Sequence, residues 1–228
     1  MKVVILGAGS GSRLKRDVPK PLVHLSERLT ILDLQLRYLT HVVRVDDILV
    51  VAGFRSDLFA QRYPYLRFVH NGRYAHTNTA ASLRVGFDAI NEDDVLWLNG
   101  DVVFSGEVLS DLERRPTHNL VWVSNHSLGD EEIKYTLDSE GYVKKLSKTV
   151  KNGLGEGVGI NFIRSEDVPH FKSCLARCAD SDYFERAVEL AIEMGVKFKP
   201  FDVRDHFCVE VDFEEDLQKA KAYAKVAL

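Results

Sequence analysis

The feature that most constrains the fold is an alternation of short apolar runs with helical patterns in the first half of the chain. Five runs, bounded by Gly, Asn or Asp, have the composition and length of buried strands: Val3–Leu6, Ile48–Val51, Leu66–Val69, Val95–Leu98 and Leu120–Val123. Segments with helix-like spacing of apolar residues lie between them: Ile31–Val43, Asp57–Arg62, Ala80–Ile90 and Glu107–Arg114. Such alternation forms βαβ units with right-handed crossovers. It predicts an α/β fold, with a mostly parallel sheet covered by helices on both faces.

The pattern changes in the second half, where strands come in closer succession. Two runs flank Ser139-Glu140-Gly141 and predict a hairpin, Lys134–Asp138 with Tyr142–Leu146. The elements expected after it are the glycine-rich segment Gly153–Gly159, strand Ile160–Ile163, helices Val168–Cys178 and Asp182–Met194, strands Val196–Phe201 and Cys208–Val211, and a helix from Phe213 onward. No linker interrupts this succession. We expect one domain over residues 1–228, in which residues 125–165 form a small β-rich lobe over one edge of the sheet.

Charge and cysteine content restrict the partners and the compartment. The 228 residues include 30 Lys plus Arg against 34 Asp plus Glu, a net charge of −4. Neither a nucleic-acid partner nor a membrane partner is expected, because such binders normally carry a basic excess. An anionic ligand must therefore be held by a local cluster of cations. Three cysteines, the absence of a signal-peptide pattern and the absence of a long apolar run favour the reducing cytoplasm.

A glycine-rich loop follows the first expected strand. It reads Gly7-Ala8-Gly9-Ser10-Gly11-Ser12-Arg13-Leu14 and is followed by Pro19-Lys20-Pro21-Leu22. Glycines at alternate positions allow successive backbone N–H groups to point at one anion, and Arg13 and Lys20 add positive charge. The loop is not a P-loop, because Gly-Lys-Ser/Thr is missing, and Ser12 replaces the third glycine of a dinucleotide fingerprint. Phosphate binding and a plain flexible turn are the interpretations that stay open.

Two distant segments supply carboxylates at strand ends. One is Asn99-Gly100-Asp101, and the other is Val209-Glu210-Val211-Asp212, in which the two acids share one face of a strand. Such oxygen ligands suit Mg²⁺. The alternative for Asp212 is a helix cap, because Asp212-Phe213-Glu214-Glu215 resembles a helix start. The alternative for Asp101 is an ordinary acidic turn, although Gly100 favours a close backbone approach.

A polar helix start at His76–Leu83 places Asn78 and Ser82 one turn apart. The two side chains could reach one ligand, and simple capping by Asn78 is the alternative. Further along, a lysine cluster (Lys144, Lys145 and Lys148) follows the hairpin. Judged alone, such a cluster is more typical of a solvated face than of a binding site.

The loop and the Pro-Lys-Pro segment resemble the signature of nucleotidyltransferases that couple an NTP to a phosphorylated acceptor. These enzymes include sugar-1-phosphate nucleotidyltransferases and phosphocholine-type or aminoethylphosphonate-type cytidylyltransferases. Gly7 stands where the family usually has alanine. The later motifs fall in family order, so the resemblance extends over nearly the whole chain. It implies a Rossmann-like fold of the nucleotide-diphospho-sugar transferase kind.

The resemblance also implies roles for individual residues. Those implied for nucleotide binding are Leu6, Ala8, Gly9, Ser10, Gly11, Asn78, Ser82 and Gly100. Those implied for catalysis on the phosphates are Arg13, Lys20 and Lys148, and those implied for the metal are Asp101 and Asp212. Those implied for the acceptor are Tyr135, Glu156, Asp182, Tyr183 and Glu210. An acidic and aromatic lining suits a cationic or polyhydroxyl group, with capping and core packing as the alternative.

The expected function is a Mg²⁺-dependent nucleotidyltransferase that favours CTP. The phosphate or phosphonate oxygen of a small acceptor would attack the α-phosphorus of CTP, and pyrophosphate would leave. A role in capsule or cell-surface glycan precursor synthesis is expected, and a homodimer is left open. The alternatives are a sugar-1-phosphate nucleotidyltransferase and a nucleotide-binding module without chemistry. A nicotinamide oxidoreductase is a more distant one.

Overall fold

The central feature of the fold is a mostly parallel sheet, as the alternation predicts. The structure is a computed structural model that describes residues 1–14, 16–91, 93–113, 115–125, 132–203 and 205–227. Seven strands follow one another across the sheet in the order β10 (Phe198–Asp202), β6 (Asn119–Ser124), β9 (Gly155–Ile163), β4 (Val95–Asn99), β1 (Lys2–Gly7), β2 (Ile48–Ala52) and β3 (Arg67–His70). Their pairings are parallel, except that β9 runs antiparallel to both β4 and β6.

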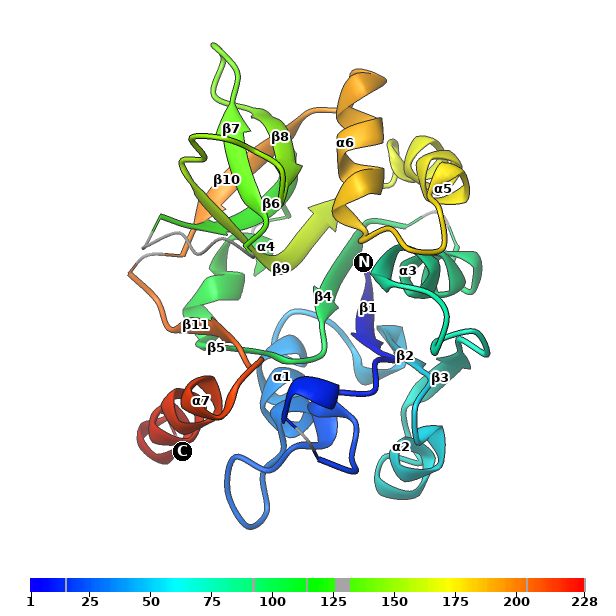
Figure 1. Ribbon diagram of the computed structural model, residues 1–228, viewed down its shortest axis with the longest axis vertical. Helices are drawn as coiled ribbons and strands as arrows, with labels where there is room; N and C mark the ends of the chain where they lie inside the picture. Colours follow the sequence, from blue (N-terminus) through cyan, green and yellow to red (C-terminus); the bar gives the residue numbers. More distant parts are fainter. Residues whose placement is uncertain (15, 92, 114, 126–131, 204, 228) are drawn as a thin grey trace.

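Helices cover both faces of this sheet (Figure 1). Successive residues of β1 point to opposite faces, so Val4 and Leu6 enter one core cluster and Val3 and Ile5 enter another. The first face is covered by α3 (Thr79–Asp88), α5 (Val168–Arg177) and α6 (Glu185–Glu193). The second face is covered by α1 (Ile31–Leu39), α2 (Ser56–Arg62) and the short α4 (Ser110–Glu113). The predicted two-sided covering is confirmed.

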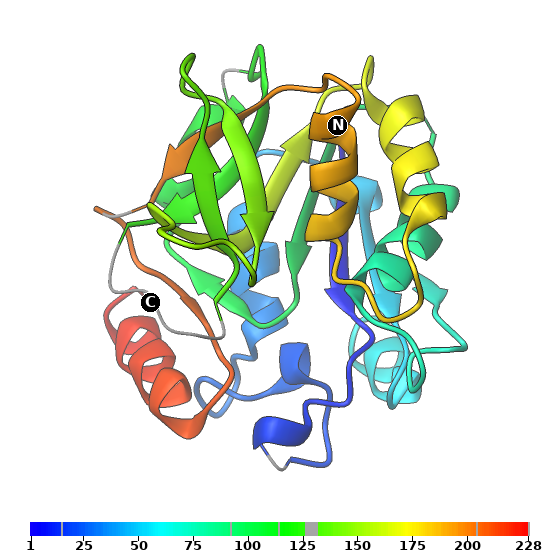
Figure 2. The same cartoon turned by 45° about the horizontal axis from the view of Figure 1, so that its top comes forward.

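The β-rich lobe differs from the expectation in its attachment. The hairpin of β7 (Lys134–Leu137) and β8 (Val143–Ser147) forms as predicted. The hairpin joins the sheet through β9, the third of the seven strands, and β8 packs on the edge strand β10. The part of the expected lobe at Gly155–Ile163 is therefore an interior strand of the sheet. Figure 2 shows the hairpin standing in front of the sheet beside α6. Residues 126–131 of the expected lobe lie outside the described residues.

A second, two-stranded sheet was not predicted. It pairs β5 (Val102–Phe104) with β11 (Cys208–Glu210) in antiparallel register. Strand β5 has three residues and its partner comes about a hundred residues later, so the local sequence carries little signal for it. Helix α7 (Glu214–Val226) packs on this sheet and on α1 through a third apolar cluster that includes Leu217 and Ala220.

Several helix boundaries also differ from the predicted ones. The helix expected at Ile31–Val43 ends at Leu39, and the one expected at Asp182–Met194 begins at Glu185, after a turn. The segment Glu107–Arg114 forms a 3₁₀ helix, Gly106–Leu109, that continues into α4, and Arg114 lies outside the described residues. Further 3₁₀ turns occur at Ser12–Leu14, Lys20–Leu22 and Val45–Asp47.

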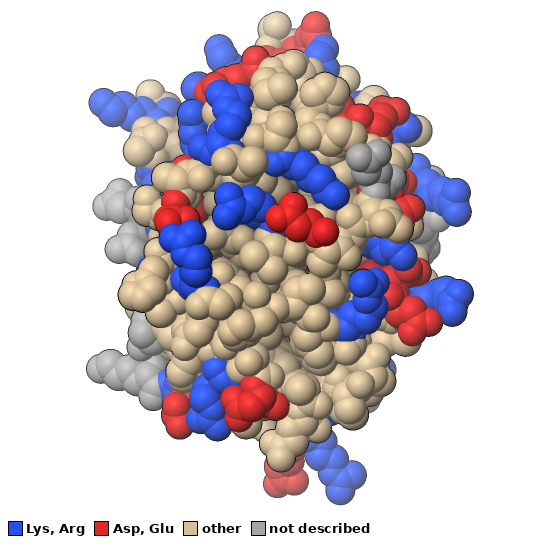
Figure 3. Space-filling model, turned by 90° about the vertical axis from the view of Figure 1, so that its right-hand side faces the viewer, with Lys and Arg blue, Asp and Glu red and all other residues tan. Residues whose placement is uncertain are grey.

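The surface carries charges of both signs. On the face shown in Figure 3, Lys and Arg side chains lie among Asp and Glu side chains around a broad area of other residues. This mixture fits the near balance of 30 basic and 34 acidic residues. Within the residues that the structure describes, every helix is too short or too polar to cross a bilayer.

Candidate active site

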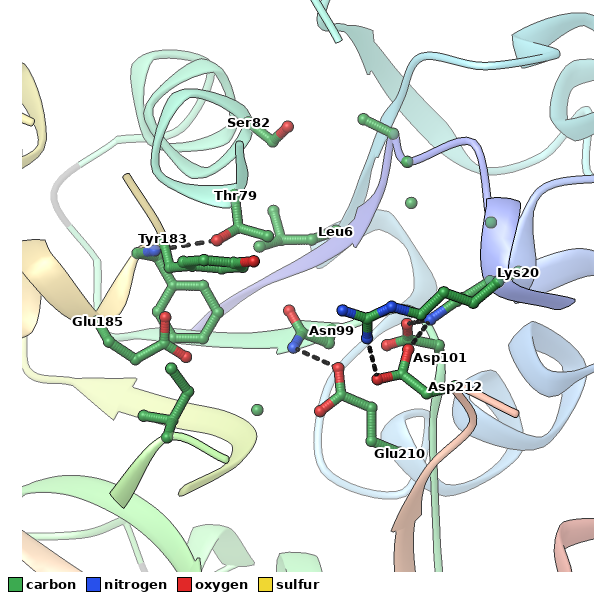
Figure 4. A pocket seen from close by; sticks show the side chains of 18 of the residues that line it. Leu6, Lys20, Thr79, Ser82, Asn99, Asp101, Tyr183, Glu185, Glu210 and Asp212 are labelled. Atoms are coloured by element: carbon green, nitrogen blue, oxygen red, sulfur yellow. Dashed lines mark hydrogen bonds and ion pairs between the residues drawn. The ribbon is translucent and has the colours of Figure 1, made fainter. Parts of the chain in front are cut away.

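A cavity of about 340 Å³ opens at the carboxyl ends of β1 and β4. Ligands in open α/β sheets usually bind at this end of the strands. Its walls come from the loop after β1, the start of α3, strand β9, the hairpin lobe, the start of α6 and the segment after β11. Figure 4 shows Lys20, Asp101 and Asp212 at one side, Tyr183 and Glu185 at the other, and Asn99 between them.

The glycine-rich loop forms one wall of the cavity. Leu6, Ala8, Gly9 and Gly11 line it. Gly11 has φ of +62°, a left-handed conformation that residues with a side chain rarely adopt, so the turn favours glycine at this position. The chain then forms the two 3₁₀ turns that bring Arg13 and Lys20 to the cavity.

The β5–β11 ladder brings the two distant aspartates together. Glu210 pairs with Val102 in the ladder, and the N–H of Val211 donates to the carbonyl of Asp101 at 2.9 Å. The chain just after β11 therefore runs beside the turn that carries Asp101. As expected, Glu210 and Asp212 face the cavity while Val211 is fully buried on the other side.

The carboxylates of Asp101 and Asp212 meet at one ammonium group. Lys20 Nζ donates to Asp101 Oδ2 at 2.8 Å and also to Asp212 Oδ1. Arg13 Nη1 donates to Asp212 Oδ2 at 2.6 Å. The side chains of Lys20 and Asp101 are only 16% and 15% exposed, so water screens this pair little. The expected convergence of the amino-terminal loop with both aspartates is present.

This ion cluster shifts the pKa values of its members. Burial by itself would lower the pKa of Lys20, but the nearby carboxylates of Asp101 and Asp212 outweigh it and raise that pKa. Burial would raise the pKa of Asp212, and its hydrogen bonds with Lys20 and Arg13 lower it instead. Both shifts favour the charged forms of Lys20 and Asp212.

The helix-cap interpretation of Asp212 is wrong. Helix α7 begins at Glu214, and the carboxylate of Asp216 accepts hydrogen bonds from the N–H groups of Phe213 and Asp212. Asp216 thus satisfies the free backbone donors at the helix start. The carboxylate of Asp212 is left to contact Lys20 and Arg13.

Glu210 is a third carboxylate in this part of the cavity. Its side chain reaches the cavity space, and Asn99 Nδ2 donates to its Oε1 at 3.3 Å. The crowding of protein atoms around it, and then the negative charges of Asp101 and Asp212, raise the pKa of Glu210 well above its ordinary value. Glu210 is accessible to water, but the walls of the cavity surround its carboxylate. The surrounding protein atoms and the two negative charges therefore shift its pKa in the same direction.

The start of α3 forms another wall. Ser82 lines the cavity, and its hydroxyl accepts a hydrogen bond from Asn71 Nδ2 at 3.0 Å. Asn78 caps the helix, because its Oδ1 accepts from the N–H of Thr79 at 2.8 Å. The capping interpretation of Asn78 is therefore observed, and Thr79 is the neighbouring residue that lines the cavity.

The wall opposite the ion cluster is acidic and aromatic. Lys148 Nζ lies 4.8 Å from the centroid of the Tyr183 ring. Glu185 and Glu132 line the same side, and Glu132 is hydrogen-bonded to Glu156 behind it. Burial, and then the charge of Glu132, raise the pKa of Glu156 to about 7. Burial raises the pKa of Glu185 to about 7 as well.

The structure brings most of the predicted site residues to this one cavity. Those that line it are Leu6, Ala8, Gly9, Gly11, Arg13, Lys20, Ser82, Asp101, Lys148, Tyr183, Glu210 and Asp212. Those that do not are Ser10, Asn78, Gly100, Tyr135, Glu156 and Asp182. Their predicted roles stay predictions.

The predicted residues outside the lining have structural contacts of their own. Tyr135 is buried, and its hydroxyl donates to Asn125 Oδ1 at 2.7 Å. Asp182 accepts from the N–H of Ala179 at 2.8 Å. Gly100 supports the site from behind, because a Cβ there would lie 2.6 Å from Pro21 Cγ and 2.7 Å from the Leu6 carbonyl oxygen. The sequence predicted such a close backbone approach, because a glycine precedes Asp101.

Sequence reasoning missed several lining residues. They are Thr79, Asn99, Glu132, Ile133, Phe184 and Glu185. Thr79 follows the predicted residue Asn78, and Asn99 precedes the predicted residue Gly100. The predicted helix start and strand end therefore already indicated these two positions. Glu185 belongs to the run Asp182-Tyr183-Phe184-Glu185. A glutamate in the first turn of a helix usually faces solvent, so its sequence position did not indicate that it lines the cavity.

The chemistry of the donor set fits a hard divalent cation. Mg²⁺ is usually held by one or two carboxylates, with phosphate oxygens of the substrate and water completing its shell. Asp101 and Asp212 already bind one common cation, the Lys20 ammonium, so both present oxygens to one point. Within the described part of the chain, no cluster of three or more His, Cys, Asp or Glu residues forms a complete protein-only metal site.

Comparison with known proteins gives one family and several relatives. Residues 3–168 match the sequence profile of the MobA-like NTP transferase domain. The chain is 27% identical over 241 residues to CMP-5'-(3-aminopropyl)phosphonate synthase of Streptomyces rubellomurinus, a match that covers 96% of this chain and 38% of that protein. It is 33% identical over 114 residues to the bifunctional protein GlmU of Synechococcus elongatus, which covers 48% of this chain and 25% of that protein. The chain thus spans well under two thirds of the length of either relative.

Solved structures of similar fold cover nearly the whole chain. The inositol-1-phosphate CTP transferase of T. maritima has a TM-score of 0.80 at 17% identity, covering 98% of this chain and 96% of that one. The CTP:phosphocholine cytidylyltransferase of Streptococcus pneumoniae has a TM-score of 0.80 at 18% identity, covering 98% of both chains. A putative glucose-1-phosphate thymidylyltransferase of Bacillus anthracis has a TM-score of 0.76 at 17% identity, covering 98% and 95%. At these identities the likeness shows the fold, which is that of nucleotidyltransferases.

Proposed function

This chain belongs to the MobA-like NTP transferase family, and from that premise we propose that it is a cytidylyltransferase acting on a small phosphate or phosphonate acceptor. An acceptor oxygen attacks the α-phosphorus of CTP and forms a new P–O bond. The bond between the α-phosphorus and its bridging oxygen breaks, and the electron pair leaves with pyrophosphate. The acceptor is already an anionic nucleophile, so neither a covalent enzyme intermediate nor a strong general base is needed.

The observation that carries this proposal is the convergence of Lys20, Asp101 and Asp212 in the cavity wall. Phosphoryl transfer depends mainly on positioning and on neutralising the charge of the phosphates. In our proposal Lys20, Arg13 and the backbone N–H groups of the glycine-rich loop hold the triphosphate. Lys148, on the opposite side of the cavity, steadies the acceptor and the α-phosphate.

We propose that Asp101 and Asp212 hold a Mg²⁺ ion together with the triphosphate. The ion supplies charge neutralisation for the phosphates and the leaving pyrophosphate when bound. The two carboxylates provide hard oxygen ligands at one point of the wall. Lys20, which contacts both of them in the structure, is close enough to add its own charge to the same phosphates.

The preference for CTP is supported by the relatives. The name of the relative matched over 96% of the chain describes a CMP-phosphonate synthase, and two of the similar structures are CTP transferases. Ser82 and Thr79 place small polar groups at the α3 wall, where we propose that the base or ribose binds. The free state of Cys174, Cys178 and Cys208 agrees with the proposed cytoplasmic setting.

A sugar-1-phosphate nucleotidyltransferase is the second candidate. The GlmU match, 33% identical over 114 residues, and the fold of the thymidylyltransferase favour it. The two candidates differ in the nucleotide and in the acceptor, so a single set of assays separates them.

The test is a matrix of the four NTPs against a panel of acceptors, scored by pyrophosphate release with and without Mg²⁺. The panel contains 3-aminopropylphosphonate, phosphocholine, inositol-1-phosphate and glucose-1-phosphate. The proposal predicts Mg²⁺-dependent release with CTP and at least one acceptor. Release with an NTP other than CTP and glucose-1-phosphate alone would favour the second candidate, and no release in any well would contradict both.

A further inference from the structure

We propose that Gln35 is a positioning residue for the metal site, and that it acts by holding the turn that carries Asp101. This inference rests on the proposed function, because Asp101 is one of the two proposed Mg²⁺ ligands. Gln35 belongs to α1 and lies outside the cavity lining, so it acts only through the backbone of that turn.

The first observation is that one side-chain amide bridges the two ends of the turn. Strand β4 ends at Asn99 and β5 begins at Val102. Gly100 and Asp101 form the connection between them. Gln35 Nε2 donates to the Asn99 carbonyl at 3.0 Å and to the Val102 carbonyl at 2.8 Å. The two donor hydrogens of the amide thus hold both ends of a four-residue turn.

The bond to Val102 supplies a partner that the β5–β11 ladder does not. The N–H of Val211 donates to the Asp101 carbonyl at 2.9 Å, so these residues form a hydrogen-bonded pair. Bonded and non-bonded pairs alternate along an antiparallel ladder, so the carbonyl of Val102, the next residue, is directed away from β11. It faces α1, where Gln35 donates to it. The backbone around Asp101 is therefore held from both sides, by β11 and by Gln35.

The second observation is that Gln35 is a polar residue in an apolar setting. Only 1% of its surface is exposed, and its neighbours Leu34 and Leu36 lie in two of the core clusters. Its Oε1 has no hydrogen-bond partner among the described residues. An unpaired buried oxygen lowers stability, and an apolar side chain of similar length would avoid it. The benefit of a glutamine at this position therefore lies in the two bonds that its nitrogen makes with the turn.

The turn carries two side chains of the cavity wall, Asn99 and Asp101 (Figure 4). A displacement of this turn would move the Asp101 carboxylate away from the point that it shares with Asp212. Residues that support metal ligands from behind commonly change metal affinity or activity by about 10–100-fold. Gln35 supports Asp101 in this way, through the backbone of the turn and not through the carboxylate itself.

The first test measures metal binding rather than turnover. Mn²⁺ is titrated into the wild type and into Gln35→Met with a non-hydrolysable CTP analogue, and free Mn²⁺ is followed by electron paramagnetic resonance. Methionine keeps the length and the helix propensity of glutamine and removes both donors. We expect Gln35→Met to bind Mn²⁺ about tenfold or more weakly than the wild type. Equal binding would overturn this inference alone, whereas a wild type that binds no Mn²⁺ would overturn the metal proposal with it.

Asn119→Leu is the matched control for damage to the core. Asn119 is a buried amide of β6 whose Nδ2 also donates twice, to Asp167 Oδ2 at 2.8 Å and to the Lys197 carbonyl at 3.0 Å. It lies outside the cavity lining, so its loss should lower stability and leave the Mn²⁺ affinity unchanged. Urea unfolding identifies conditions in which both variants stay folded. Mn²⁺ binding weakened as much in Asn119→Leu as in Gln35→Met would show a general effect of core damage and overturn the inference.

Hydrogen exchange of the metal-free protein gives a readout that needs neither metal nor nucleotide. The amides of residues 100–103 should exchange faster in Gln35→Met than in the wild type or in Asn119→Leu, because the turn has lost its contacts with α1. Exchange of these amides at the wild-type rate in Gln35→Met would overturn the inference.

A double-mutant cycle tests whether Gln35 acts through Asp101. Gln35→Met is combined with Asp101→Asn, and the Mn²⁺ affinities of the wild type, the two single variants and the double variant are compared. If the glutamine positions the Asp101 carboxylate, its loss should weaken binding by less than about threefold once that carboxylate is absent. A tenfold effect of Gln35→Met that persists in the Asp101→Asn background would contradict the proposed route.

Discussion

At the scale of single residues, Lys20 provides the positive charge that compensates both aspartates of the site. Its ammonium contacts Asp101 and Asp212, and the two carboxylates add negative charge around Glu210. Without this lysine, carboxylates in a poorly screened site would face one another with little compensation. Pro19 and Pro21 flank Lys20 and restrict the backbone from which its side chain extends.

We predict that Lys20→Met lowers kcat/KM for CTP by about a hundredfold or more, the usual cost of losing one preorganised charge on a reacting group. Pyrophosphate release at a temperature well below unfolding measures this. Lys2→Met is the control, because Lys2 is also a partly buried, ion-paired lysine but pairs with Asp47 outside the cavity lining. A Lys20→Met enzyme within threefold of the wild type would remove this residue from the proposed mechanism.

Glu185 gives a second residue-scale prediction, on stability. Burial raises its pKa from 4.5 in the unfolded chain to about 7 in the fold. A carboxyl with a raised pKa contributes stability below its unfolded pKa, and that contribution is lost as the pH rises through about 7. Relative to the wild type, Glu185→Gln should therefore gain up to about 3 kcal/mol in unfolding free energy between pH 4.5 and pH 8. Urea unfolding at several pH values checks this, with Glu193→Gln expected to show no such trend, and a pH-independent difference for Glu185→Gln would speak against the buried, unpaired state.

At the scale of elements, the β5–β11 ladder and α7 fix the position of Asp212. The ladder aligns the chain after β11 with the turn at Asp101. Helix α7 begins two residues after Asp212 and packs against the ladder and α1, with Leu217 fully buried in that contact. The geometry of the carboxylates thus depends on packing remote from the cavity.

We predict that Leu217→Ala lowers the free energy of unfolding by about 2–5 kcal/mol, the usual range for emptying a buried leucine site. Val226→Ala, at an 88% exposed position of the same helix, should change it by less than about 0.5 kcal/mol. Denaturant unfolding of both variants makes the comparison. Equal small effects would show that α7 is not held by this cluster.

The sequence predicted well the elements that local patterns determine. It predicted poorly the elements that depend on pairing with distant parts of the chain. The five strands of the first half and the helix start at Asn78 were predicted because apolar period and capping residues are local features, although β3 is a partly exposed edge strand and not a buried one. Strand β5 and the central place of β9 were not, because pairing partners distant in the chain determine them.

The same distinction holds for the candidate site. Arg13, Lys20, Asp101 and Asp212 belong to recognisable motifs at strand ends. Glu185 belongs to the run Asp182-Tyr183-Phe184-Glu185, which resembles a family helix start, but its burial had no local signal because it results from how α6 packs beside the cavity. Tyr135 was predicted to contact the acceptor because it is aromatic. In the fold its ring is buried in the interior of the lobe instead.

At the scale of the whole molecule, the site exists because the sheet collects segments separated by up to about two hundred residues. Arg13 and Asp212, which are 199 positions apart, form a direct ion pair at the carboxyl edge of the strands. The basic and carboxylate groups lie at one side of the cavity and the acidic, aromatic wall at the other (Figure 4). This polarity supports our proposal that the triphosphate binds at the basic side of the cavity.

The central claim, that Asp101 and Asp212 together hold one divalent cation with the nucleotide, is tested most directly by titrating Mn²⁺ into the protein with a non-hydrolysable CTP analogue and following free Mn²⁺ by electron paramagnetic resonance. The control is Asp111→Asn, a substitution at an exposed residue of α4. Our account predicts one Mn²⁺ per wild-type chain and per control chain, bound about tenfold or more tightly than in Asp101→Asn and in Asp212→Asn. Mn²⁺ binding of wild-type strength in both of these variants would contradict it.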